Sequence, residues 1–422
     1  MTVFLKTITA KFSRENFLLL LYLFAFFLPF DMFFCNLLTI LGLLFAVLEH
    51  KISPPFDKGV NMLFFLFFGL FLCQLVGLAY TQDIKMGLFS TEKRLALLVF
   101  PLVFYFTRFK ISPKDTKRLF FFFQLGLSTC VSYCIAVAMK SNYAYNAFES
   151  IQWKLFSDTL LDPIGINHLA YGIYAALALT YFVYQVVERK EKVIWYQLLF
   201  LAIITLGLVL LVPKMGWISI FFATSYILFR NRSNISIKYL VVAAILSGVI
   251  LAIMLKIPKS RERIRQFTYG FSRNNIINDS THYSSSRAGA FYASLDLIKE
   301  HWILGLGTGG IDKEMTKWYM DRNLSGLVGL DTHNQYFDFL LSYGILGLSF
   351  FLLSLFYPLW LAHQRSFTLY STFLIIMIFS FLTENFLNNN KGIMFFSFFN
   401  SLFAGILNHN ENVARENIGN RE

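Results

Sequence analysis

Long apolar runs that carry no charged residue constrain the fold of this chain more than any other feature. They cover residues 17–30, 61–80, 119–138 and 239–255. A helix of about 20 residues crosses a hydrocarbon core. Because backbone groups inside that core must satisfy their own hydrogen bonds, the runs predict membrane-spanning helices. Charged residues make up only 15% of the chain, against about 25% in soluble domains.

The spacing of the runs predicts an all-α polytopic membrane protein with about 12 transmembrane helices and a large, partly helical outer loop. Basic residues gather in alternate connections, as in loops that stay in the cytoplasm, so both termini are expected there. This distribution accounts for the net charge of +12 without a nucleic-acid partner. No small-residue cleavage site follows the first run, which therefore resembles a span rather than a signal peptide. The candidate spans begin near Phe17, Phe34, Asn61, Arg94, Leu119, His168, Ile194, Met215, Tyr239, Tyr336, Thr368 and Ile393.

Two of the expected outer connections are long, and the larger one is the main polar segment of the chain. Long loops in compact proteins are commonly functional or disordered, and residues 287–301 of this one have helical character. The expected units are residues 1–256 with spans one to nine and an outer loop at about 140–167, residues 257–332 as the large outer loop, residues 333–410 with spans ten to twelve, and residues 411–422 as a cytoplasmic tail.

The large outer loop opens with a cluster of Lys and Arg side chains that includes Arg265, and Arg287 follows three serines. A guanidinium group offers a planar fork of donors that matches phosphate oxygens. The cluster therefore predicts contact with anions, either lipid headgroups or a lipid-linked pyrophosphate. For the first part of the loop, a solvated segment that touches headgroups is an equally good interpretation. For Arg287, which opens a helix, we favour a binding role.

The glycine-rich residues 305–310 resemble a phosphate-binding loop only at first sight. No βαβ strand precedes them, so a dinucleotide-binding fold is unsupported. We expect a tight turn near the membrane surface instead.

The pair His333-Asn334 stands where the large outer loop re-enters the membrane. Imidazole has an ordinary pKa of about 6.5, so it can serve as a base near neutral pH. A lone histidine at a helix end is often a cap or a structural donor, and that interpretation stays open. Gly344 and Gly347 follow about one helical turn apart, a spacing that would let another helix approach closely.

Three further polar residues are expected at the outer surface. Lys214 follows Pro213 at the end of a span, where a lysine either snorkels or meets an anion. Glu384 could orient an acceptor or pair with Lys391, and His168 begins another span. The topology thus places Lys214, Arg287, His333, Glu384 and His168 near one outer plane.

The spacing of His333-Asn334, Gly344 and Gly347 resembles the signature of the O-antigen ligase and polymerase superfamily. Residues 302–309 resemble its glycine turn, and residues 383–392 resemble its late outer loop. The resemblance implies a GT-C-like fold in the bacterial inner (cytoplasmic) membrane, with the active site facing the periplasm. It implies transfer of a saccharide from an undecaprenyl-pyrophosphate-linked donor to an acceptor hydroxyl, without a nucleotide sugar, a metal or another cofactor.

The same resemblance implies roles for individual residues. His333 would act on the acceptor and Arg287 would hold the pyrophosphate. Lys214 stands where family members usually carry an arginine, and lysine keeps the charge but loses the bidentate geometry. We predict a single displacement with inversion, in which His333 is the base and Arg287 and Lys214 clamp the pyrophosphate. The further substrate-binding residues are predicted to be Asn334, Arg265, Glu384 and His168.

The sequence does not decide between three possible acceptors. Lipid A core is the first choice, a glycan repeat would make the protein a polymerase, and a protein Ser or Thr would make it an oligosaccharyltransferase. The remaining expected partner is membrane lipid. A transporter of a lipid-linked saccharide is a different class of alternative. It predicts charges near the bilayer middle and paired broken helices, whereas the charges here sit at the ends of spans.

Overall fold

The computed structural model describes residues 14–48, 56–107, 109–143, 158–211, 213–232 and 283–419. Every regular element in these ranges is a helix, in agreement with the predicted all-α class. The predicted span near Tyr239 and the side chain of Arg265 lie outside the described residues. In chain order the helices are α2 (Arg14–Phe27), α3 (Met32–Leu48), α4 (Lys58–Leu78), α5 (Ile84–Lys93), α6 (Ala96–Thr107), α7 (Pro113–Tyr143), η1 (Asp158–Ile164), α9 (His168–Val187), α10 (Trp195–Leu211), α11 (Lys214–Arg230), α15 (Tyr283–His301), α16 (Ile311–Asp321), η3 (Ser325–Leu327), α17 (Gln335–Gln364), α18 (Thr368–Ser380), η4 (Phe386–Asn388) and α19 (Asn390–Gly419).

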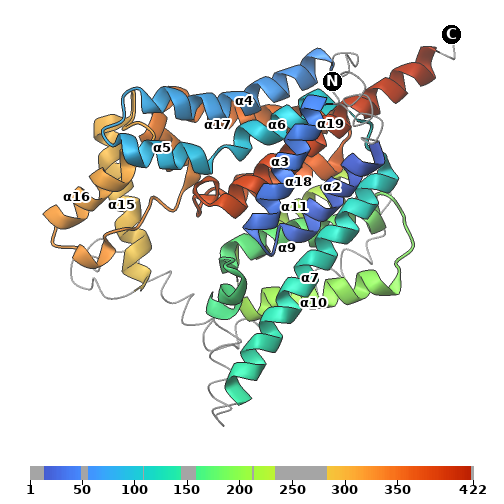
Figure 1. Ribbon diagram of the computed structural model, residues 1–422, viewed down its shortest axis with the longest axis horizontal. Helices are drawn as coiled ribbons and strands as arrows, with labels where there is room; N and C mark the ends of the chain where they lie inside the picture. Colours follow the sequence, from blue (N-terminus) through green and yellow to red (C-terminus); the bar gives the residue numbers. More distant parts are fainter. Residues whose placement is uncertain are drawn as a thin grey trace, which may run out of the picture.

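Apolar helices form the body of the molecule (Figure 1). By length and composition, α4, α7, α9 and α17 can each cross a bilayer, and α3, α10 and α18 are shorter apolar helices. These helices agree with a multi-pass membrane protein. The number of about 12 spans stays a prediction.

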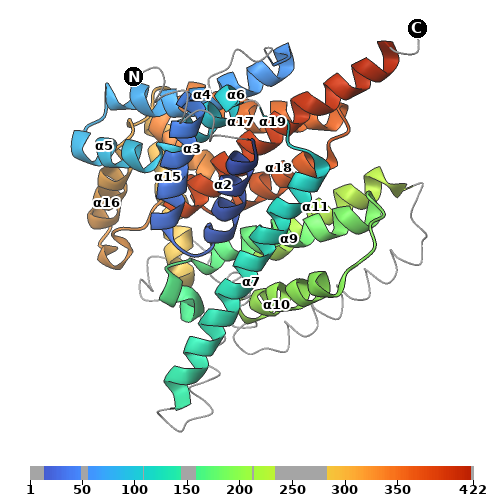
Figure 2. The same cartoon turned by 45° about the vertical axis from the view of Figure 1, so that its right-hand side comes forward.

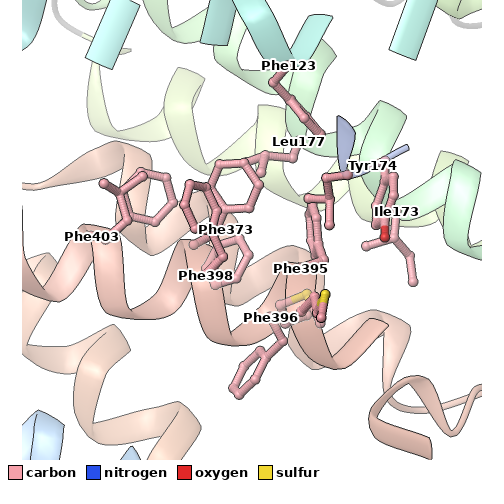
Figure 3. Packing of buried hydrophobic residues seen from close by; sticks show 14 of the residues in the cluster. Phe123, Ile173, Tyr174, Leu177, Phe373, Phe395, Phe396, Phe398 and Phe403 are labelled. Carbon is pink, nitrogen blue, oxygen red and sulfur yellow. The ribbon is translucent and has the colours of Figure 1, made fainter. Parts of the chain in front are cut away.

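Aromatic rings from α7, α9, α18 and α19 pack together at the centre of the body (Figure 3). The ring centroids of Tyr174 and Phe395 lie 4.5 Å apart and those of Phe373 and Phe403 lie 5.6 Å apart. Such pairs contribute about 0.5–1.5 kcal/mol each beyond the area they bury. The last helix of the chain is therefore a central one, because its rings contact α9 and α18 at the same time.

Helices α9 and α11 pass each other at two glycines. A side chain at Gly172 would meet the Cβ of Pro213 at 2.6 Å, and one at Gly216 would meet the Cα of Gly172 at 2.9 Å. Small residues allow such close approach of helix backbones in membranes. The crossing lies within the first turns of both helices. His168 is the first residue of α9 and Lys214 is the first residue of α11.

Helices α15 and α16 form a small unit at one end of the molecule, next to α5 (Figures 1 and 2). This outer unit has an apolar core of its own, in which Ala290, Leu297 and Met315 are buried. Leu341 from α17 belongs to the same core and joins the unit to the body. The described part of the large outer loop, from residue 283 onward, is thus packed structure.

Helix α17 is broken at Gly344, whose φ of 64° and ψ of −165° are not helical. The opened turn pairs with the glycine-rich turn of the outer unit, where the amide of Gly307 donates to the carbonyl oxygen of Ser342 at 2.9 Å. A side chain at Gly344 would lie 1.9 Å from the carbonyl oxygen of Ile303. The break therefore exposes backbone groups that dock the outer unit on the body, and only glycine fits there.

The glycine-rich residues 305–310 form the expected tight turn, with positive φ at Gly305 and Gly307. Their amides are used inside the protein. Leu306 donates to the carbonyl oxygen of Leu341 at 2.6 Å, and Gly309 donates to Thr81 Oγ1 at 3.0 Å. The turn is a docking element rather than a phosphate cradle.

The prediction that Gly344 and Gly347 admit another helix is wrong. A side chain at Gly344 would meet the main chain of Ile303 and Leu304, which lie in a loop, and one at Gly347 would meet Tyr343 of the same helix. The physical reason is the break itself, because it opens α17 to the loop and brings Tyr343 against the next turn.

Alanine at Gly344 is expected to destabilise the protein far more than alanine at Gly165. Both glycines have a positive φ, 64° and 61°, and an L-residue in this region costs about 1–2 kcal/mol. Nothing lies within 4 Å of a Gly165 side chain, whereas one at Gly344 would clash with Ile303. Thermal unfolding of both variants in detergent measures the difference. Equal unfolding temperatures would contradict the docking role of Gly344.

Candidate active site

His333 lies in the short link between the outer unit and α17. Its backbone is left-handed, with a φ of 46°, a conformation that few non-glycine residues adopt. Two contacts to Asp331 hold it. The His333 amide donates to Asp331 Oδ1 at 3.0 Å, and His333 Nδ1 lies 3.3 Å from the same oxygen. The imidazole is 30% exposed, so it is oriented by a carboxylate and still reaches the surface.

Asn334 caps the start of α17. Its Oδ1 accepts hydrogen bonds from the amides of Tyr336 and Phe337 at 2.9 and 3.1 Å. Its Nδ2 donates to the carbonyl oxygen of Leu382 at 3.0 Å. The side chain thus ties the helix to the loop between α18 and α19. This geometry gives Asn334 a positioning role, and its contact with substrate stays a prediction.

The loop between α18 and α19 is joined to the same link by further hydrogen bonds. Asn385 donates its side-chain amide to Thr332 Oγ1 at 2.8 Å. The amide of Leu387 donates to Gln335 Oε1 at 2.7 Å. These bonds flank Glu384 on its C-terminal side and fix it near His333.

Arg287, near the start of α15, forms an ion pair with Glu384, with 3.3 Å between Nη2 and Oε1. The Arg287 side chain is 35% exposed and that of Glu384 is 13% exposed. Burial raises the pKa of Glu384 to about 8, although the charge of Arg287 lowers it, and Asp331 adds to the rise. Glu384 is therefore mostly protonated near neutral pH and neutralises little of the positive charge of Arg287.

The predicted pairing of Glu384 with Lys391 is wrong. The Lys391 ammonium group donates to the main-chain carbonyl oxygens of Phe30 at 3.1 Å and Ile164 at 2.9 Å. A buried ammonium group needs such partners because desolvation is costly. Lys391 therefore joins α19 to two other segments, and Glu384 faces Arg287.

His333 also lies within the electrostatic reach of Arg287. Burial lowers the pKa of His333 below its ordinary value of 6.5, the carboxylate of Asp331 raises it, and the charge of Arg287 lowers it. The net direction is downward, so the imidazole is neutral at pH 7. A neutral imidazole is the form that accepts a proton.

Lys214 is the first residue of α11 and is close enough to Arg287 for the two positive charges to repel. An anion bound to both would relieve this repulsion. The structure therefore brings Lys214, Arg287, Glu384 and His333 together, as the sequence predicts. His168 is half-buried at the start of α9, and its contact with substrate stays a prediction, as does that of Arg265.

Sequence reasoning misses a buried polar network at the start of α17. Arg94 is 7% exposed and lies 3.6 Å from the carboxylate of Asp338, which is 3% exposed. Arg94 also donates to the Tyr343 hydroxyl at 3.1 Å and contacts the side-chain oxygens of Gln74 and Asn388. The sequence does offer a signal for this network. Arg94 and Asp338 are opposite charges that each lie beside or within an apolar run, and such charges usually pair in membrane proteins.

The site combines a neutral base with two cations. His333 can take a proton from a hydroxyl group, while Arg287 and Lys214 can hold an anion and stabilise charge that builds on a departing oxygen. Within the described ranges, no cluster of three or more His, Cys, Asp and Glu side chains could hold a metal ion. The arrangement suits group transfer away from a phosphate.

Comparison with known proteins identifies one family. Residues 198–352 match the model of the family described as O-Antigen ligase. The match contains Lys214, Arg287 and His333, whereas Glu384 and His168 lie outside it. It confirms the resemblance to the O-antigen ligase and polymerase superfamily. No match is found among curated proteins.

Replacement of Asn334 by alanine is expected to lower the free energy of unfolding by about 1 kcal/mol, because α17 loses its cap. Asn334→Asp keeps the acceptor oxygen and loses only the donor to Leu382, so it should cost less. Thermal unfolding of the two variants in detergent checks this order. An aspartate variant as unstable as the alanine variant would show that capping is not the main role.

Proposed function

Because residues 198–352 match the O-antigen ligase family, we propose that this protein is a glycosyltransferase of that type. It transfers a saccharide from undecaprenyl pyrophosphate to an acceptor hydroxyl at the periplasmic face of the bacterial inner membrane. The observation that carries the proposal is the meeting of Arg287 and Glu384, 3.3 Å apart, beside a neutral His333. Residues from three separate segments thereby combine phosphate-binding and proton-accepting groups.

Arg287 and Lys214 clamp the pyrophosphate of the donor. The two side chains come from α15 and α11, so a bound anion bridges the outer unit and the body. Arg287 offers a fork of donors and Lys214 a point charge. Both favour the departure of the pyrophosphate because they stabilise the negative charge that develops on its bridging oxygen.

His333 acts as the general base. It takes the proton of the acceptor hydroxyl as that oxygen forms a bond to the anomeric carbon, and the bond from this carbon to the pyrophosphate oxygen breaks. Undecaprenyl pyrophosphate leaves with the electron pair. A single displacement of this kind inverts the anomeric configuration. The contact of Nδ1 with Asp331 orients the ring and leaves Nε2 for the hydroxyl.

Glu384 controls the charge that Arg287 presents. With its pKa raised to about 8, the protonated carboxyl holds Arg287 in place without cancelling its charge at neutral pH. Above pH 8 the carboxylate ionises and competes with the pyrophosphate for the guanidinium group. Glu384 is thus a positioning residue for the clamp.

Lipid A core is the acceptor we favour, and the proposed chemistry is the same for a glycan repeat or a protein hydroxyl. The three cases differ in what presents the hydroxyl to His333. They share the donor, the clamp and the base.

Replacement of His333 by alanine is expected to lower the rate of glycan transfer by about 10²–10⁴-fold, the usual contribution of a general base. Transfer from undecaprenyl-pyrophosphate-linked glycan to lipid A core, in membranes with equal amounts of protein, measures the loss. His301→Ala is the matched control, because His301 lies at the end of α15 with a similar exposure of 31%. Full transfer by the His333 variant would contradict the assignment of His333 as the general base.

The pH dependence of transfer separates the two titrating groups. On the acid side, the rate should fall in wild type and in Glu384→Gln, because His333 becomes protonated below its lowered pKa. On the alkaline side, wild type should lose affinity for the donor above about pH 8, where Glu384 ionises. Glu384→Gln cannot ionise and should keep its affinity there. If Glu384→Gln lost affinity for the donor above about pH 8 as wild type does, the role of Glu384 would be refuted.

A further inference from the structure

A pocket of about 230 Å³ lies between α5, the start of α16 and the start of α17. Helices α5 and α16 lie at the same end of the molecule in both ribbon views (Figures 1 and 2). Pockets for drug-sized ligands measure about 300–1,000 Å³, so this one suits a single ring. We call it the side pocket, and its wall includes Phe89, Ser90, Arg94, Asp312, Asp331 and Asp338.

The side pocket combines hydrogen-bond donors and acceptors and has a small excess of negative charge. Asp312, Asp331 and Asp338 bring three carboxylates, against the two cations Lys93 and Arg94. Arg94 and Asp338 pair with each other at 3.6 Å, and the Lys93 ammonium group lies 4.0 Å over the Phe89 ring, so the carboxylates that are not paired with Arg94 are those of Asp312 and Asp331. Carboxylates accept hydrogen bonds from hydroxyl and ammonium groups and repel phosphates. The pocket therefore suits a ring that carries many hydroxyl groups.

The side pocket adjoins the candidate active site through one residue. Asp331 lines the pocket, and its carboxylate is also the group that contacts His333. A ligand that bonds to Asp331 from the pocket therefore contacts the carboxylate that orients the imidazole, while His333 itself is not part of the pocket wall. The clamp formed by Arg287 and Lys214 contributes no side chain to the pocket wall.

We infer that the side pocket holds a neutral or amino-bearing sugar ring of the acceptor beside Asp331, the carboxylate that orients His333. This assignment rests on the proposed function. The charge of the pocket disfavours the donor, since its pyrophosphate needs the cations of the clamp and the pocket wall holds three carboxylates against two cations. The acceptor ring and the pyrophosphate of the donor thus occupy separate places in this proposal.

A substitution that fills the side pocket tests whether the acceptor binds there. Ser90→Phe places a ring in the pocket from α5, on a half-buried position outside the buried Arg94 network. Gln82→Phe is the matched control, because Gln82 is exposed just before α5 and is not part of the pocket wall. The kinetic constants are measured on the full chain in detergent. The donor is undecaprenyl-pyrophosphate-linked glycan and the acceptor is lipid A core, both purified from a strain that lacks the gene.

Ser90→Phe should raise the KM for lipid A core by at least about tenfold and leave the KM for the donor unchanged, while Gln82→Phe changes neither. Asp312→Asn, which removes the negative charge and one acceptor oxygen without filling the pocket, should raise the same KM by a smaller factor. A rise in the donor KM alone, or no change in either KM, would overturn the assignment of the pocket. Wild-type protein that transfers no glycan would instead overturn the proposed function, and the pocket's role with it.

Discussion

The break of α17 at Gly344 is the constraint on which the rest of the outer face depends. A continuous helix would keep the carbonyl groups of Leu341 and Ser342 for its own amides. The break leaves these carbonyl groups open to the glycine-rich turn. The amides of Leu306 and Gly307 donate hydrogen bonds to them at 2.6 and 2.9 Å. Unpaired backbone groups near a membrane are costly, so the turn and the helix need each other. This pairing anchors the outer unit and thereby sets the position of Arg287.

The loop between α18 and α19 completes the site from the other side. It is joined to the link before α17 by side-chain hydrogen bonds, in particular from Asn385 to Thr332. Arg94 adds a buried cross-link to the same region, since it donates to the carbonyl oxygen of Leu387 at 3.1 Å and pairs with Asp338. The candidate base therefore stands on rigid supports, as group transfer requires.

The helices follow from the sequence because charge-free runs of span length leave the backbone no other way to satisfy its hydrogen bonds. The sequence also indicates His333 and Arg287 as candidate site residues, by residue type, motif and position. It does not predict which side chains contact them. Glu384 meets Arg287 rather than Lys391, and Asp331 orients His333, because these contacts depend on how distant segments pack. The break at Gly344 also escapes prediction, since its spacing to Gly347 equally fits an unbroken helix.

The most direct test of the account follows the lipid-linked glycan in the host of this protein. The gene is deleted, and the glycans on lipid A core, on proteins and on undecaprenyl pyrophosphate are measured before and after complementation with the wild-type gene. In the deletion strain, long-chain polysaccharide is expected to disappear from lipid A core and to accumulate on undecaprenyl pyrophosphate at the periplasmic face. Single repeats on the core would indicate a polymerase, and loss of sugar from proteins alone would indicate a protein glycosyltransferase. Accumulation at the cytoplasmic face, or no change in any of these glycans, would contradict glycan transfer by this protein.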